Sequence, residues 1–195
     1  MDTRSHLKQI ALTRFARHGY EGVSLAQIAA EAGIKKPSIY NHFESKAALF
    51  LELADDAENT ILALVTESLA SQRQAPFEQR LRHLVECCCT ISYREHQGVF
   101  YKRFLLFPPQ ELSHEARALS ARAERRLDQR LGEIFSAGQA DAALHPALDE
   151  AAFIAAFYCL VDWAAVGNLH VRQGCAGAAL RGRVWQVFWR GVRAG

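Results

Sequence analysis

The ten residues from position 34 to position 43, IKKPSIYNHF, concentrate hydrogen-bonding groups of different kinds on a short piece of chain. The groups belong to Lys35, Lys36, Ser38, Tyr40, Asn41 and His42. Cationic side chains attract phosphate groups, whereas hydroxyl and amide groups can form hydrogen bonds with the edges of bases. The chemistry that this set of residues best supports is therefore the recognition of a nucleic acid.

The apolar residues of the same segment are spaced for one face of a helix. Ile34, Ile39 and Phe43 lie five and four positions apart, so they can face inward while the polar residues face outward. Pro37 fits the first turn of a helix, where its missing N–H group costs no hydrogen bond. The alternative interpretation is an ordinary amphipathic helix on the surface of a helical protein.

A second short helix is predicted directly before this one. Ser24 and Gln27 have the spacing of a capping box, and Gly33 suits the left-handed position that follows a helix. Two short helices joined by a tight turn are the outline of a helix-turn-helix motif, here from about residue 24 to residue 43. Ser24 and Lys46, at the starts of the neighbouring helices, are placed to contact phosphates.

Helical periodicity continues through nearly the whole chain, and strand patterns are almost absent. A first helix is expected to end near Gly19, and Ser45, Pro76 and Ser113 can open later ones. The longer predicted helices cover about residues 46–70, 113–137, 150–172 and 178–192. We therefore predict an all-α fold of about nine helices.

Charge is distributed unevenly along the 195 residues, although the formal net charge is only +2. Residues 1–50 carry a net charge of +3, and residues 51–70 carry −5. A basic segment followed by an acidic one indicates a boundary between surfaces that have different partners.

Several classes of protein are disfavoured. The N-terminal segment is amphipathic and interrupted by charge, unlike a signal peptide. The apolar segment 151–171 contains Asp162, so a buried helix is preferred over a membrane span. The chain has no phosphate-binding glycine loop, no nucleophile elbow and no HExxH motif. We expect a cytoplasmic protein that is not an enzyme, contacts no membrane and needs no cofactor.

The cysteines predict reduced thiols rather than a metal site. There are five of them, without CxxC spacing: Cys87, Cys88, Cys89, Cys159 and Cys175. Three consecutive positions on a helix point about 100° apart and cannot jointly hold one metal ion. The alternative is a metal or thiol-reactive effector that acts at residues 87–89.

Residues 23–50, VSLAQIAAEAGIKKPSIYNHFESKAALF, resemble the DNA-binding signature of the TetR family of bacterial transcriptional regulators. The resemblance rests on the hydroxyl residue Ser24, on QIAAEAGI through the turn, and on PSIYNHFESKAALF with its Tyr-x-His-Phe core. It covers about the first 60 residues. It implies a helix-turn-helix domain at residues 1–50 and a helical effector-binding and dimerisation domain at residues 51–195.

The resemblance also divides the candidate DNA contacts into two groups. Phosphate contacts are implied for Ser24, Tyr40, His42 and Lys46. Base contacts are implied for Lys35, Lys36, Ser38 and Asn41. The implied partner is double-stranded DNA with a palindromic operator, bound by a homodimer, because one such domain makes too few contacts for tight specific binding at physiological salt.

The resemblance further implies a repressor that a small apolar effector releases from DNA. The candidate pocket residues are Tyr93, Phe100, Arg103, Phe104, Phe107 and Phe157. The candidate dimer-interface residues, on the last two long helices, are Phe153, Trp163, Val166, Trp185, Phe188 and Trp189. For both sets the alternative is that the aromatic side chains form the core of a single chain.

Two alternatives to a repressor remain open. One is an activator of the same family, and the other is a helical interaction protein that kept the fold without binding an operator. A degraded recognition segment would favour the second alternative. The polar residues between positions 35 and 42 are all present, so the sequence favours DNA binding.

Overall fold

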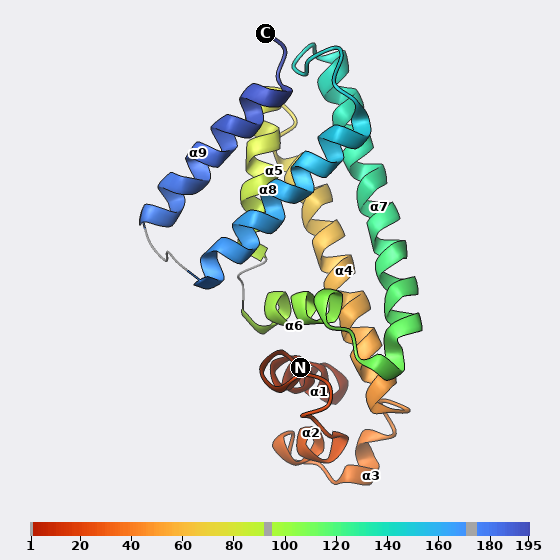
Figure 1. Ribbon diagram of the computed structural model, residues 1–195. Helices are drawn as coiled ribbons and strands as arrows, with labels where there is room; N and C mark the ends of the chain where they lie inside the picture. The colour runs from red at the N-terminus through yellow and green to blue at the C-terminus, as the bar shows by residue number, and fades with distance from the viewer. Residues whose placement is uncertain (1, 92–94, 171–174) are drawn as a thin grey trace. The chain divides into compact units, whose positions relative to one another are not determined.

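The computed structural model describes residues 2–91, 95–170 and 175–195, with side chains described except at 89–91, 95, 163–170 and 175–178 (Figure 1). The helices are α1 Thr3–His18, α2 Leu25–Glu31, α3 Lys36–Ile39, α4 Lys46–Ser71, α5 Phe77–Ile91, α6 Glu95–Leu106, the 3-10 turn η1 Gln110–Leu112, α7 Ser113–Ala140, α8 Glu150–His170 and α9 Cys175–Val192. Within these residues there is no strand beyond an isolated bridge between Leu144 and Arg193. The predicted all-α fold is confirmed.

The chain forms two compact units. The first unit comprises Met1–Thr60 and Tyr93–Ala123, and the second comprises Ile61–Ser92 and Glu124–Gly195. The division falls inside α4 and inside α7, so the first unit contains α1, α2, α3 and α6 together with parts of two long helices. The functional division predicted at residue 50 stays a prediction.

Local hydrogen bonds define the first two helices. Asp2 caps α1 by accepting a hydrogen bond from the Ser5 N–H group at 2.8 Å, and α1 ends at Gly19. Ser24 caps α2, where both hydrogen bonds of the predicted capping box with Gln27 are present. Gly33 follows α2 with a φ of 72°, a conformation that glycine adopts without the steric cost of a Cβ atom.

Helix α3 is shorter than predicted. The sequence predicted a helix up to Phe43, but regular α-helix ends at Ile39. The N–H groups of Tyr40, Asn41 and His42 instead donate to carbonyl groups three residues earlier, which is the tighter 3-10 pattern. The Phe43 N–H group returns to the Ile39 carbonyl at 3.0 Å. The residues predicted to read bases therefore lie partly on a tight turn rather than on a regular helix.

An aromatic cluster forms the core of the first unit. The Phe50 ring from α4 lies 5.2 Å from the Phe15 ring, 4.9 Å from the Tyr20 ring and 5.2 Å from the Phe100 ring, measured between centroids. Phe104 completes the cluster at 6.0 Å from Phe50. These contacts join α1, α4 and α6, so α6 belongs to the same core as the helix-turn-helix region.

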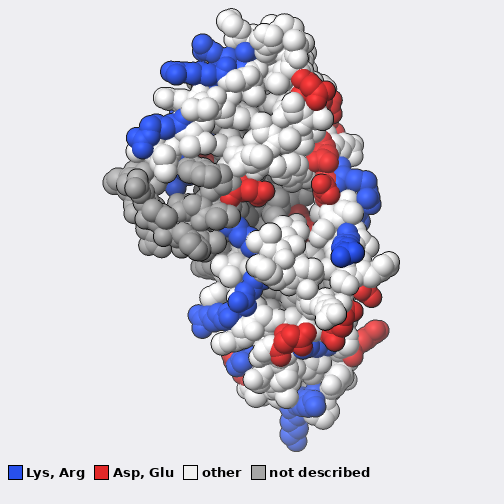
Figure 2. Space-filling view, in the orientation of Figure 1, with Lys and Arg blue, Asp and Glu red and all other residues white. Residues whose placement is uncertain are grey.

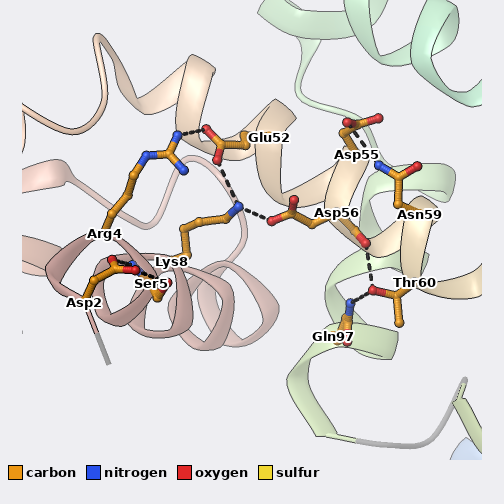
Figure 3. Close-up of polar contacts among 10 residues, drawn as sticks. All are labelled: Asp2, Arg4, Ser5, Lys8, Glu52, Asp55, Asp56, Asn59, Thr60 and Gln97. Atoms are coloured by element: carbon orange, nitrogen blue, oxygen red, sulfur yellow. Dashed lines mark hydrogen bonds and ion pairs between the residues drawn. The ribbon is translucent and has the colours of Figure 1, made fainter. Parts of the chain in front are cut away.

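Charged side chains fasten α1 to α4 at the surface of this core (Figure 3). Arg4 donates to one oxygen of Glu52 at 2.6 Å, and Lys8 donates to the other at 2.9 Å and also pairs with Asp56. Further along α4, Gln97 from α6 donates to the Thr60 hydroxyl at 3.3 Å. Burial opposes ionisation of Glu52, but the hydrogen bonds from Arg4 and Lys8 hold its pKa below the usual value.

The Lys8–Glu52 pair is expected to contribute about 0.5–1 kcal/mol to the stability of the first unit. A double-mutant cycle with Lys8→Met and Glu52→Gln, followed by urea denaturation, measures this coupling free energy. Because the pKa of Glu52 is lowered in the folded state, the contribution is present above the usual pKa of 4.5 and is lost as the pH falls further. The difference in free energy of unfolding between the wild type and Glu52→Gln should therefore shrink as the pH falls. A difference that stays constant with pH would contradict this role of Glu52.

The second unit has its own apolar core, formed by α5, α8, α9 and the C-terminal part of α7. Phe153 and Phe157 on α8 are buried, as is Leu131 on α7. The indole rings of Trp185 and Trp189 on α9 are stacked, with centroids 6.0 Å apart. In the described part of the chain, no helix is long and apolar enough to cross a membrane.

Candidate nucleic-acid interface

The segment from Lys35 to Phe43 has a polar outer face and an apolar inner face. Ile39 has an exposed fraction of 0% and Phe43 is also buried, so both belong to the core, whereas Tyr40 is 49% exposed. Lys35, Lys36 and Asn41 are exposed, and Ser38 and His42 are half-buried. In the region of α2 and α3, basic side chains project into solvent (Figure 2). The predicted sidedness is confirmed.

Four of the eight predicted DNA contacts line one surface hollow of about 420 Å³. They are Ser24, Lys36, Tyr40 and Lys46. The hollow thus combines the start of α2, the start of α3 and the start of α4 with two ammonium groups, a hydroxyl and a phenol. These groups can hold a phosphate by ionic and hydrogen-bonding contacts. Lys35, Ser38, Asn41 and His42 do not line this hollow.

Lys46 makes contacts that the sequence did not predict. Its ammonium group donates to the Tyr20 carbonyl at 3.0 Å and lies 3.8 Å from the centroid of the Tyr20 ring. An ammonium group has three N–H donors, so two are left after this hydrogen bond. The Tyr20 carbonyl and ring therefore hold Lys46 in place at the edge of the hollow.

Glu44 also lines the hollow, and sequence reasoning missed it. A carboxylate at this place repels a phosphate and so lowers affinity for DNA. Glu44 could have been recognised from the sequence, because it is an acidic residue between two predicted phosphate contacts, His42 and Lys46. Its negative charge in the hollow limits how tightly a polyanion can bind without base contacts.

Replacing Glu44 with glutamine is expected to strengthen DNA binding on all sequences by about fivefold, since one like-charge repulsion of about 1 kcal/mol is removed. Fluorescence anisotropy with specific and unrelated duplexes measures this change. Glu115→Gln is the matched control, because Glu115 is an exposed carboxylate of the first unit that does not line the hollow. Equal effects of the two substitutions would show that only net charge matters.

The sequence that forms this site matches a known protein family. Residues 10–53 match the model for bacterial regulatory proteins of the tetR family. The match spans the C-terminal part of α1, α2, α3 and the first part of α4, and it contains the whole hollow. The predicted resemblance to the tetR family is thus confirmed for this part of the chain.

Two curated relatives match mainly through the same region. The HTH-type transcriptional regulator AcrR of Shigella flexneri is 33% identical over 96 residues, which cover 48% of this chain and 45% of AcrR. The probable acrEF/envCD operon repressor of Escherichia coli K12 is 34% identical over 86 residues, covering 44% of this chain and 39% of that protein. The alignments therefore span less than half the length of these two tetR-type relatives.

The tetR fold is shared over the full length with solved structures. The ketosteroid transcriptional regulator KstR2 of Mycobacterium tuberculosis is 20% identical, covers 100% of this chain and 96% of its own, and superposes with a TM-score of 0.74. At this identity the similarity shows the fold alone.

The predicted pocket residues do not share one cavity. Phe100, Arg103 and Phe107 line a cleft in the first unit, whereas Phe104 is buried in the aromatic core and Phe157 lies in the second unit. Tyr93 lies outside the described residues. The structure thus brings three of the six together.

The predicted dimer-interface residues fall into different environments. Phe153 and Trp185 are buried within the second unit, so they are core residues of a single chain, which is the alternative that the sequence left open. Phe188 and Trp189 are half-buried on α9. The side chains of Trp163 and Val166 lie outside the described residues. Exposed residues that sequence reasoning missed on α9 include Val187, which is next to Phe188.

Cys87 and Cys159 are free thiols. The Cys87 sulfur lies 3.6 Å from the His83 imidazole one turn earlier on α5. Among the described residues no group of three or more His, Cys, Asp or Glu side chains could hold a metal ion.

Proposed function

We propose that this chain is a DNA-binding transcriptional regulator that recognises its operator through residues 24–46. The observation that carries the proposal is the hollow formed by Ser24, Lys36, Tyr40 and Lys46 within a tetR-family domain. The exposed Lys35 and Asn41 lie beside α3, where they can reach base edges. A regulator of this family is not an enzyme, and we infer no catalytic role for the chain.

The proposed complex is a homodimer on a palindromic operator. One domain offers few phosphate and base contacts, and two domains on two half-sites supply the affinity and salt resistance that specific binding requires. Helices α8 and α9, with Phe188, Trp189 and the exposed Val187, are the proposed dimer surface. We further propose repression, released by a small effector, since the Escherichia coli relative is named an operon repressor.

Selection of binding sites from random duplexes, followed by mobility-shift measurements at two salt concentrations, tests DNA recognition. We expect an enriched palindromic sequence and binding that weakens as salt increases. The matched control is the double variant Lys36→Ala and Asn41→Ala, which changes only exposed side chains. If the wild type enriched no sequence, or if the control enriched the same one equally, the proposed operator recognition would be wrong.

Light scattering at micromolar concentration tests the dimer separately. The expected mass is twice the 21.8 kDa of one chain. A mass of one chain, under conditions in which the protein still binds its selected sequence, would overturn the dimer while leaving DNA recognition intact.

A further inference from the structure

A cleft of about 540 Å³ lies within the first unit, between the C-terminal ends of α1 and α6. Its lining includes Phe15 and Phe100, which are each only 1% exposed, and Phe107, whose ring is the accessible aromatic surface. Phe107 is 78% exposed, which is unusual for so large an apolar side chain and leaves its ring available at the rim. The volume suits a small organic molecule, since ligand pockets are typically about 300–1,000 Å³.

The cleft also presents a cation that is suited to an anionic ligand. Arg103 is exposed, lines the cleft and makes no ion pair with any carboxylate among the described side chains. Its guanidinium group reaches over Gly19, where a Cβ atom would lie 3.4 Å from Arg103 Nη1. A Cβ atom at position 19 would therefore be in van der Waals contact with the guanidinium group.

Two other titratable groups face the same cleft from the end of α1. They are the imidazole of His18 and the carboxyl group of Glu21. The phenol of Tyr20 is neutral, because burial and a hydrogen bond to Glu111 raise its pKa well above the usual range. Arg103 is the permanently charged cation of the lining, and a planar guanidinium group binds a carboxylate or sulfonate through two parallel hydrogen bonds.

We propose that this cleft binds a small aromatic or apolar molecule that carries one anionic group. The apolar part packs against the exposed ring of Phe107, and the carboxylate or sulfonate accepts hydrogen bonds from Arg103. The site lies wholly within the unit that holds the helix-turn-helix residues, and it uses three of the side chains that the sequence predicted for an effector pocket.

Tyr20 connects the cleft to the DNA-facing hollow. Tyr20 lines the cleft, and its ring and its carbonyl group hold the ammonium group of Lys46. A ligand that packs against Tyr20 shifts the position of Lys46 and so changes DNA affinity. This regulatory consequence rests on the proposed function, whereas binding of the ligand does not.

Two matched fluorescent probes test the site in the absence of DNA. Anilinonaphthalene sulfonate carries the proposed anionic group, and phenylnaphthylamine has the same aromatic skeleton without the sulfonate. For the full chain we expect one saturable site for each probe. Arg103→Gln should weaken the sulfonate about 10- to 100-fold and leave phenylnaphthylamine unchanged, because a hydrogen bond to a charged group is lost.

Two further variants complete the design. Phe107→Ser removes exposed apolar surface and should weaken both probes, while Arg117→Gln, an exposed arginine of the first unit that does not line the cleft, should change neither. Sulfonate binding that is absent in the wild type, or equal in the wild type and Arg103→Gln, would overturn the site.

The regulatory step is measured separately with the selected duplex. Saturating anilinonaphthalene sulfonate should change the wild-type dissociation constant for DNA by at least about fivefold and leave that of Arg103→Gln unchanged. An unchanged constant for the wild type overturns the coupling through Tyr20 while the probe site stands. If no duplex is selected at all, the proposed function fails, and the probe titrations still decide the site.

Discussion

Replacing Phe50 with alanine is expected to lower the free energy of unfolding of the first unit by about 3–5 kcal/mol, the cost typical of removing a buried phenylalanine. Phe50 is 4% exposed and contacts four aromatic rings, from Phe15, Tyr20, Phe100 and Phe104. The substitution leaves a cavity where α1, α4 and α6 meet. Because whole domains are commonly stable by only about 5–15 kcal/mol, the helix-turn-helix region should be largely unfolded at elevated temperature.

Urea denaturation followed by far-ultraviolet circular dichroism measures this loss. All three tryptophans of the chain belong to the second unit, so tryptophan fluorescence follows that unit separately. Phe107→Ala is the matched control, because the same side chain is removed from an exposed position, where the expected cost is below about 0.5 kcal/mol. Similar losses of unfolding free energy for the two substitutions would contradict the assignment of Phe50 to the core.

Lys46→Ala and Asn41→Ala are expected to weaken DNA binding in different ways. Lys46 lies in the hollow proposed to hold a phosphate, so its removal should weaken binding similarly on every sequence and reduce the salt slope by about one. Asn41 is exposed outside the hollow and is proposed to contact a base. Its removal should cost about 1–3 kcal/mol on the selected operator and relax the preference at one position of each half-site.

Affinities measured over a salt series, for the selected operator and for its single-base variants, separate the two effects. Lys46 also holds the Tyr20 carbonyl, so the thermal stability of Lys46→Ala must be measured beside its affinity. Arg117→Ala is the control for removal of an exposed positive charge in the same unit. If Lys46→Ala and Asn41→Ala changed affinity and specificity alike, the division into phosphate and base contacts would be wrong.

The caps and the turn of the first four helices show what sequence patterns can predict. The capping box of Ser24 and Gln27 spans three residues, and the cap that Ser45 provides to the Ala48 N–H group, at 2.9 Å, spans the same distance. Gly33 has the predicted left-handed conformation. Each prediction rests on hydrogen bonds or steric limits between residues within one helical turn, and such interactions form in much the same way in any fold.

The extent of α3 and the environment of the aromatic residues were less predictable. The pattern of Ile34, Ile39 and Phe43 identified the buried face but not the change from α-helix to 3-10 turns after Ile39, which depends on where the chain must leave for α4. Aromatic residues at helical spacing predict burial, but they do not show which surface buries them. Phe153 and Trp185 therefore fitted an interface and a core equally well until their packing within the second unit was known.

The sequence by itself determined the all-α fold, the helix-turn-helix segment and the residues that face outward from it, because periodicity and capping depend on neighbours within about four positions. Only the tertiary structure decided that Lys46 is held by Tyr20, that Arg4 and Lys8 fasten α1 to α4, and that Arg103 lies over Gly19 beside an aromatic cleft. These contacts join residues 26 to 84 positions apart in the chain. Which side chains meet over such separations is settled by how the helices pack, and packing follows from the summed burial of many apolar residues rather than from any local pattern.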